Sequence, residues 1–182
     1  MKLTSPGPAL HRHRVLGRDG REFEALKLRT MIADADSFWE RHPDLFREFR
    51  RSFKLQNDPR VTPLGRWLRK TSLDELPQLL NVVRGEMSLV GPRMITRAEL
   101  EKYGQHADLL LSVPPGLTGL WQVSGRQDVD YTRRVELDVE YIQRWSLGLD
   151  LQIILRTVPT VLRARGAHCR ADTRTPHHRA EK

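Results

Sequence analysis

Apolar residues recur at intervals of three and four along much of the chain, which is the spacing of amphipathic α-helices. The helices that this spacing predicts span residues 34–53, 72–83, 96–111, 130–145 and 150–163. In the first of them, Pro43 marks either a break or the first turn of a second half. Most of the five phenylalanines lie in this helix, so we expect it to pack in the core.

Two of the predicted helices begin with the spacing of a capping box. Ser72 precedes Glu75 by three residues, and Thr96 precedes Glu99 in the same way, so each hydroxyl is expected to cap its helix. Pro77 interrupts the first of these helices, because proline has no backbone N–H to donate.

The remaining segments predict a β-hairpin and ordered loops. Residues 9–31 hold two partly alternating runs on either side of a Gly-bounded turn, which is typical of a hairpin. Residues 85–93 read as a loop with one short apolar segment. Residues 113–126 contain too much proline and glycine for a regular helix and read as an ordered loop with short extended pieces. We therefore predict a mostly helical α+β fold with a small hairpin or sheet: one compact domain over residues 1–166, and a basic, disordered tail over 167–182.

Charge and composition narrow the classes of function. The chain has 31 Lys and Arg against 23 Asp and Glu, a net charge of +8, which favours an anionic partner: nucleic acid, lipid headgroups or a phosphorylated substrate. The single cysteine, Cys169, excludes an internal disulfide. The sequence contains no run of 18 apolar residues, the length that predicts a membrane span. It also lacks the motifs of zinc proteases, serine hydrolases and Rossmann cofactor sites.

The most informative chemistry lies in the first turn of the helix predicted over 72–83. Asp74 and Glu75 form a carboxylate pair there, directly after the cations Arg69 and Lys70. A carboxylate at a helix N-terminus stays ionised, as a nucleophile or a metal ligand must, and neighbouring cations can receive phosphate oxygens. Acidic residues in a first turn also serve as ordinary compensation of the helix dipole, so the spacing alone leaves both interpretations open. Arg93 and Arg126, each after a glycine-containing turn, are further candidates for anion contact.

Four long segments resemble the bacterial sugar transferase family, the monotopic phosphoglycosyl transferases. In chain order they read SPGPALHRHRVLGRDGREFEALKLRTM, DPRVTPLGRWLRKTSLDELPQLLNVVRGEMSLVGPR, PGLTGLWQVSGR and ELDVEYIQRWSLGLDLQIILRTVPTVL. The resemblance implies transfer of a sugar-1-phosphate from a UDP-sugar to a polyprenyl (undecaprenyl) phosphate, which initiates the repeat units of exopolysaccharide, O-antigen or capsule. It also implies a covalent aspartyl-phosphosugar intermediate and assistance by Mg²⁺.

The resemblance assigns roles to particular residues. Asp74 matches the nucleophile and Glu75 its partner, and the pair would hold the Mg²⁺. Arg69, Lys70, Arg93 and Arg126 are the expected phosphate contacts, in falling order of support. The family also has a hydrophobic membrane helix before the SPGP segment, and this sequence begins just after the place where that helix would end.

We expect a peripheral protein on the cytoplasmic face of the bacterial inner membrane, with the basic residues near Trp67 and after Arg156 among anionic headgroups. The modest supply of apolar residues also predicts self-association as a homo-oligomer. Two alternatives stay open: a truncated relative without activity and, less favoured, a basic nucleic-acid-binding protein. The sequence lacks the helix-turn-helix, RNP and zinc-finger signatures that the second would need.

Overall fold

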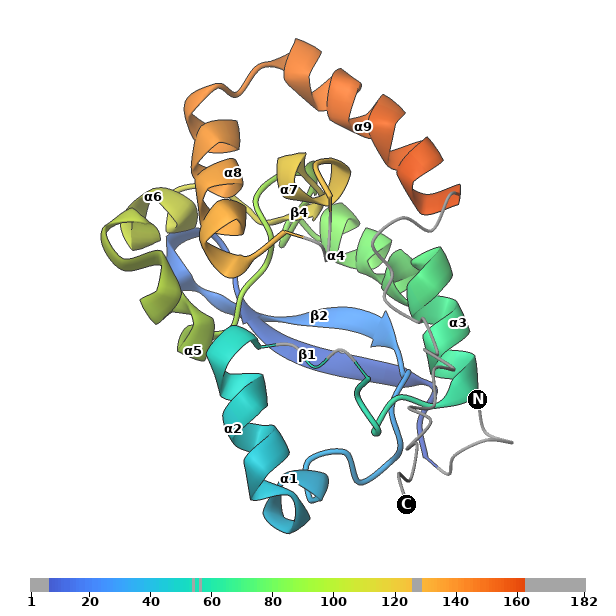
Figure 1. Ribbon diagram of the computed structural model, residues 1–182. Coiled ribbons are helices and arrows are strands. Elements are labelled where there is room, and N and C mark those ends of the chain that lie inside the picture. Colours follow the sequence, from blue (N-terminus) through green and yellow to red (C-terminus); the bar gives the residue numbers. More distant parts are fainter. Residues whose placement is uncertain (1–6, 54, 56, 126–128, 163–182) are drawn as a thin grey trace, which may run out of the picture.

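The computed structural model describes residues 7–53, 55, 57–125 and 129–162 (Figure 1). It confirms a mostly helical α+β fold in one compact domain. The strands are β1 (Leu10–Leu16), β2 (Glu22–Leu28), β3 (Ser88–Val90) and β4 (Gly116–Thr118). The α-helices are α1 (Phe38–Arg41), α2 (Pro43–Ser52), α3 (Pro63–Thr71), α4 (Leu79–Val83), α5 (Arg97–Leu100), α6 (Ala107–Leu111), α7 (Leu120–Val123), α8 (Tyr131–Gln143) and α9 (Leu147–Leu162). The 3₁₀ helices are η1 (Arg18–Gly20), η2 (Leu73–Gln78) and η3 (Glu101–His106).

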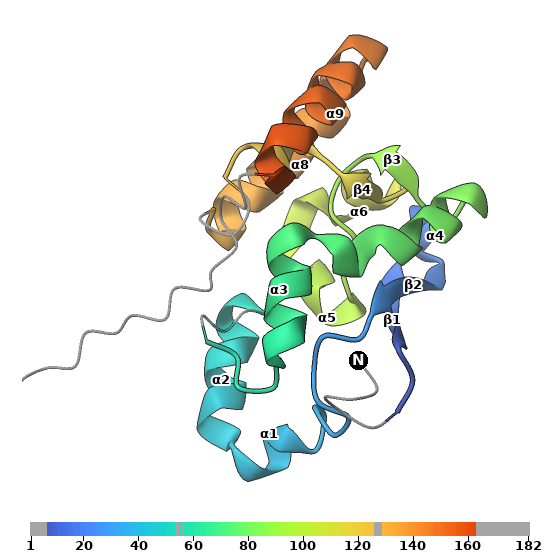
Figure 2. The same ribbon diagram turned by 90° about the vertical axis from the view of Figure 1, so that its right-hand side faces the viewer.

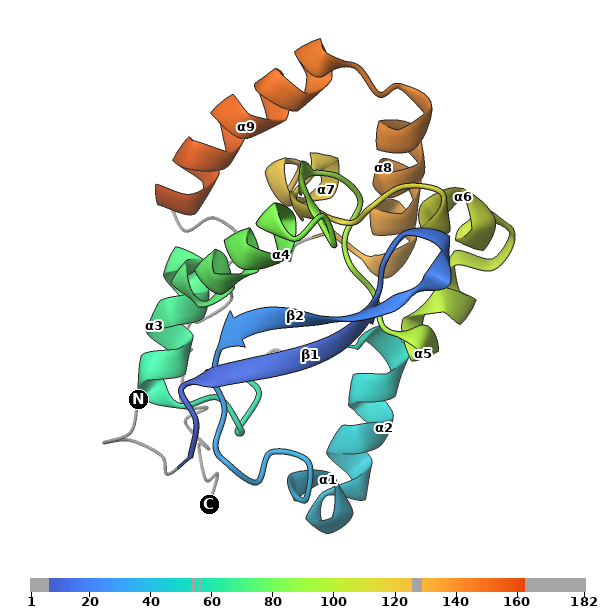
Figure 3. The same cartoon turned by 180° about the vertical axis from the view of Figure 1, so that it is seen from behind.

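The predicted hairpin is present and forms the centre of the molecule. Strands β1 and β2 pair antiparallel, from Leu10 opposite Leu28 to Leu16 opposite Glu22. The turn between them uses left-handed backbone at Asp19 (φ 58°) and Gly20 (φ 72°), a conformation that Asp and Gly tolerate better than other residues. Helices lie on both sides of the hairpin, and Figure 3 shows the same arrangement from behind.

A second, parallel sheet pairs β3, within the loop predicted over 85–93, with β4, one of the short extended pieces predicted within 113–126. Gly91 and Gly116 permit it, because a Cβ on Gly116 would lie 2.1 Å from the Gly91 backbone nitrogen. The prediction that residues 113–126 contain no helix is wrong, since α7 occupies Leu120–Val123. Its single turn is too short to produce a periodic apolar pattern.

The core consists of three groups of buried apolar residues. They are Val15, Ala25, Met87 and Met94 beneath the hairpin; Ile95, Tyr103, Leu110 and Val135 between η3, α6 and α8; and Val90, Tyr141 and Ile153 between β3, α8 and α9. The core therefore joins the hairpin to the C-terminal helices through the segment from β3 to α6.

The phenylalanine-rich helix does not enter this core. It is divided at Pro43 into α1 and α2, and their described side chains include no buried residue. Instead, the aromatic rings pack on one another, with Trp39 5.3 Å from Phe46 and the Arg60 guanidinium 3.8 Å above Trp39. The expectation of a core helix is wrong because these rings shield each other rather than the centre of the domain.

The later helices follow the prediction with shifted ends. Thr96 and Glu99 form the predicted capping box, but the helix expected over 96–111 is divided into α5, η3 and α6, with a kink at Gly104 (φ 49°) inside η3. Helix α8 lies within the predicted range, and α9 begins at Leu147 rather than residue 150. Within the described ranges, no helix is both long and apolar enough to cross a bilayer.

Candidate active site

The candidate carboxylates lie just after a sharp change of direction at the end of α3. Ser72 adopts the left-handed conformation (φ 57°), and its N–H closes α3 on the Arg69 carbonyl at 3.2 Å. The predicted Ser72–Glu75 capping box is therefore wrong, because the Ser72 side chain makes no capping hydrogen bond to the next helix. With Pro77 inside it, that helix starts as 3₁₀ helix η2 and continues as α4.

Asn81 fixes η2 and α4 against the free edge of β2. Its side chain is fully buried; Oδ1 accepts from the Leu26 N–H at 3.0 Å, and Nδ2 donates to the Glu24 carbonyl at 2.8 Å. Nδ2 also donates to Glu86 Oε2 at 2.7 Å. These bonds replace a third strand at the hairpin edge, and Figure 2 shows α4 beside β2. As a result, Lys27 on β2 reaches η2, where its Nζ lies 3.7 Å from Glu75 Oε1.

Asp74 is buried, with 8% of its surface exposed. Burial, together with the negative charge of Glu75, raises the pKa of its carboxyl group to about 6, against the opposing effect of Lys27 and Arg69. Burial also lowers the pKa of Lys27, although Glu75 beside it acts in the opposite direction. The site thus holds a poorly solvated carboxylate that is mostly ionised at neutral pH, with cations on two neighbouring elements.

The structure brings some of the predicted cations to this carboxylate and separates others. Arg69 acts on Asp74 electrostatically, and its Nε donates to Thr30 Oγ1 at 2.9 Å. Lys70 is exposed on α3, and no contact joins it to the other candidates within the described part of the chain. Arg126 lies outside the described residues.

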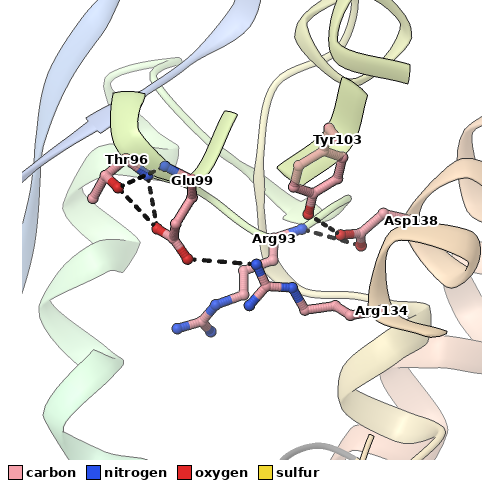
Figure 4. A network of polar contacts seen from close by, with 6 residues as sticks. All are labelled: Arg93, Thr96, Glu99, Tyr103, Arg134 and Asp138. Atoms are coloured by element: carbon pink, nitrogen blue, oxygen red, sulfur yellow. Dashed lines mark hydrogen bonds and ion pairs between the residues drawn. The ribbon is translucent and has the colours of Figure 1, made fainter. Parts of the chain in front are cut away.

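Arg93 is held at the site through its backbone. The carboxylate of Asp138 on α8 accepts the Arg93 N–H at 3.3 Å and the Tyr103 hydroxyl at 2.8 Å. Asp138 is 1% exposed, and burial raises its pKa to about 6. Figure 4 shows the Arg93 side chain leaving Asp138 and passing the guanidinium of Arg134. The charge of Arg93 also lowers the pKa of Lys27.

Two residues of the site, Lys27 and Asp138, are absent from the sequence-based candidates. The signal for Lys27 is its place in the alternation of β2, where it shares a face with the buried Ala25. The signal for Asp138 is an acidic residue between Val135 and Tyr141 on the apolar side of a helix. In both cases a charged residue occupies a position where the pattern predicts an apolar core residue.

Comparison with known proteins identifies the family of the chain. Residues 1–164 match the family described as bacterial sugar transferase. The exopolysaccharide production protein ExoY of Rhizobium meliloti is 50% identical over 172 residues, which cover 92% of this chain and 76% of ExoY. An undecaprenyl-phosphate galactose phosphotransferase of Salmonella typhimurium is 48% identical over 166 residues, 89% of this chain and 35% of that protein. A UDP-glucose:undecaprenyl-phosphate glucose-1-phosphate transferase of Caulobacter vibrioides is 46% identical over 176 residues, 92% of this chain and 62% of that protein. The chain therefore belongs to the bacterial sugar transferase family and is a phosphoglycosyl transferase.

Proposed function

We propose that the protein transfers a sugar-1-phosphate from a UDP-sugar to polyprenyl phosphate, with Asp74 as the covalent nucleophile. The observation that carries this proposal is the buried, ionisable Asp74 beside Lys27 and Arg69. The names of similar proteins support the two substrates, since they include UDP-glucose, UDP-galactose and undecaprenyl phosphate. The expected product initiates the repeat unit of an exopolysaccharide, O-antigen or capsule.

The reaction has two displacements at phosphorus. An Asp74 carboxylate oxygen attacks the β-phosphorus of the UDP-sugar, and the bond from that phosphorus to the bridging oxygen breaks, so UMP leaves with the electron pair. A phosphate oxygen of the polyprenyl phosphate then attacks the same phosphorus. The bond to Asp74 breaks, the carboxylate is restored, and polyprenyl-diphosphate-sugar is formed.

The charges around Asp74 suit both steps. Lys27, Arg69 and Arg93 supply positive charge where the transferred phosphoryl group and the departing UMP become more negative. Glu75 raises the pKa of Asp74 and so increases the basicity of the attacking oxygen, while its contact with Lys27 at 3.7 Å keeps Glu75 beside the site. Arg126 and the exposed Lys70 remain proposed phosphate contacts.

The carboxylate pair suits a magnesium ion that is also coordinated by the phosphates of the substrate. Mg²⁺ is commonly held by one or two carboxylates together with substrate phosphates, and the described residues contain no group of three or more metal-ligating side chains. We propose that Asp74 and Glu75 hold Mg²⁺ with the diphosphate of the donor. The ion would neutralise part of the diphosphate charge.

An apolar face beside the site fits a membrane surface. Helix α9 packs inward through Ile153 and through Thr157, whose hydroxyl lies 2.7 Å from that of Thr118. Its outer side repeats apolar residues at helical spacing, all of them exposed: Leu147, Leu151, Ile154, Leu155 and Val158. Figures 1 and 2 show α3, α4 and α9 on one side of the molecule, and exposed apolar residues on the first two are Trp67, Leu80 and Val83.

We propose that this face, here called the apolar face, lies in the headgroup region of the inner membrane on its cytoplasmic side. An apolar stripe that no other part of the described chain covers is unfavourable in water. Its free energy falls when it enters the interface of a membrane. Exposed arginines nearby, such as Arg66 and Arg156, add attraction to anionic lipids. The arrangement keeps Asp74 close to the lipid substrate.

The function is tested by nucleotide release. Wild-type protein in detergent with Mg²⁺, a UDP-sugar and a short polyprenyl phosphate should release UMP, and Asp74→Asn should reduce the rate at least about 10³-fold, because the nucleophile is lost. Asp108→Asn, which alters an exposed aspartate on α6, is the matched control and should keep the wild-type rate. Equal rates for wild type and Asp74→Asn would contradict the proposal; no release by either would favour the inactive-relative alternative.

The raised pKa of Asp74 also predicts a pH-dependent stability. Because the folded-state pKa of about 6 lies above the ordinary 3.8, the folded protein binds this proton more tightly than the unfolded chain. The free energy of unfolding should therefore fall as pH rises from about 4 to about 6 and stay reduced above that. At 1.36 kcal/mol per pKa unit, the loss is up to about 3 kcal/mol.

Urea unfolding in EDTA measures this effect. Asp74→Asn should be more stable than wild type at pH 7.5, and the difference should vanish near pH 4. Asp108→Asn should follow wild type at both values. A less stable Asp74→Asn protein at pH 7.5 would show that the cations, rather than burial, dominate at this carboxyl group.

The apolar face is tested by sedimentation with vesicles that contain phosphatidylglycerol. Replacing Leu151 and Leu155 together by Gln should weaken binding at least about tenfold, because each buried CH₂ contributes about 0.8 kcal/mol. Gln152→Ala on the same helix should bind as wild type does. If the double variant binds vesicles as wild type does but forms a smaller oligomer, the apolar face joins copies of the chain instead.

A further inference from the structure

Most of the unpartnered buried polar atoms of the described residues belong to α7 and α8. Five buried side-chain nitrogen or oxygen atoms of the described residues have no hydrogen-bond partner. Four belong to this region, namely Trp121 Nε1, Gln122 Oε1, Tyr131 OH and Arg134 Nε. Since a buried donor or acceptor without a partner costs free energy of folding, such a concentration indicates a place where a ligand supplies the missing bonds.

Two guanidinium groups lie against the Trp121 indole ring in this region. Arg134 is 3.9 Å from the centroid of Tyr131 and 5.9 Å from that of Trp121, and it forms an ion pair with Glu99 at 3.4 Å. Arg93 is 5.0 Å from the Trp121 centroid. Among the described residues, no hydrogen bond or ion pair joins the Arg93 guanidinium to a protein acceptor, and Figure 4 shows it extending away from Asp138. Its N–H groups therefore remain available to an anion.

The chemistry of the unpartnered atoms distinguishes between ligands. Trp121 Nε1 and Arg134 Nε are donors, and a phosphate group can accept from both. Gln122 Oε1 is an acceptor and needs an N–H or O–H donor, which an ionised phosphate or pyrophosphate group does not provide. A nucleoside provides both kinds of partner through its base and ribose hydroxyls, and its planar base can stack on aromatic and guanidinium faces.

The position of Arg93 connects this region with the carboxylate pair. Arg93 lies 5.0 Å from the Trp121 ring centroid, and its charge also acts on Lys27, whose Nζ lies 3.7 Å from Glu75 Oε1. A diphosphate with its β-phosphorus at Asp74 would place its nucleoside beyond Arg93.

We propose that Trp121, Gln122 and Arg134 form the nucleoside subsite for the donor, and that the UMP product is held there. This inference rests on the proposed function for the orientation of the diphosphate. Gln122 is the residue that requires a nucleoside rather than a simple anion, and Trp121 and Arg134 position the base and the α-phosphate.

Calorimetric titration tests the subsite with UMP and with inorganic pyrophosphate as separate probes. Gln122→Met keeps the side-chain shape and removes the acceptor, so it should weaken UMP binding about tenfold and leave pyrophosphate binding within twofold. Gln105→Met, at an exposed glutamine of η3, is the matched control and should leave both unchanged. Wild-type UMP affinity in Gln122→Met, or an equal loss for both probes, would overturn the proposal.

A second measurement needs no variant in the subsite. In saturation-transfer NMR with the wild-type chain, the base and ribose protons of UMP should receive magnetisation from the protein, and absence of transfer to the base would contradict the proposal. Asp74→Asn should still bind UMP in this experiment. A failure of the covalent mechanism would therefore leave the result unchanged, whereas a failure of the subsite would abolish it.

Discussion

Burial of the Asp74 carboxyl group requires positive charge from separate parts of the chain to meet at the end of α3. Lys27 comes from the hairpin and Arg69 from α3. Desolvation opposes ionisation of Asp74, and the cations favour it, so the carboxyl group is neither fixed as a salt bridge nor neutral at physiological pH. A nucleophile for phosphoryl transfer needs this balance, since a strongly paired carboxylate would attack weakly.

The rest of the domain can be understood as support for that balance. Asn81 ties η2 to the backbone of β2, and Asp138 ties the Arg93 backbone to α8 and Tyr103. Both are buried polar residues whose bonds reach across long stretches of sequence, so their loss would move a charge rather than simply open a cavity. The left-handed Ser72 turns the chain so that Asp74 points inward from η2. The exposed apolar residues of α9 lie outside this framework.

The sequence predicts the local elements well and the long-range ones poorly. The hairpin turn, the Thr96–Glu99 capping box and α8 depend on signals within a few residues, and the structure confirms them. The Asp74–Glu75 pair is also visible in the sequence, but the structure around it is not. Ser72 does not cap the next helix as predicted; instead the chain changes direction there, which depends on tertiary packing. The parallel pairing of β3 with β4 involves strands of three residues each, too short for an alternating pattern. Lys27 and Asp138 are recognisable only as charges in inward-facing positions, and their partners come from distant segments.

Intact-protein mass spectrometry can detect whether Asp74 itself carries the sugar phosphate. The protein is mixed with a UDP-sugar and Mg²⁺ without any lipid acceptor, then quenched and measured before and after addition of polyprenyl phosphate. If Asp74 is the nucleophile, the protein gains the mass of one sugar phosphate, located on the peptide that contains Asp74 and lost when the acceptor is added. Full UMP release in the presence of acceptor, with no adduct at any time or with the adduct on another residue, would contradict this role of Asp74.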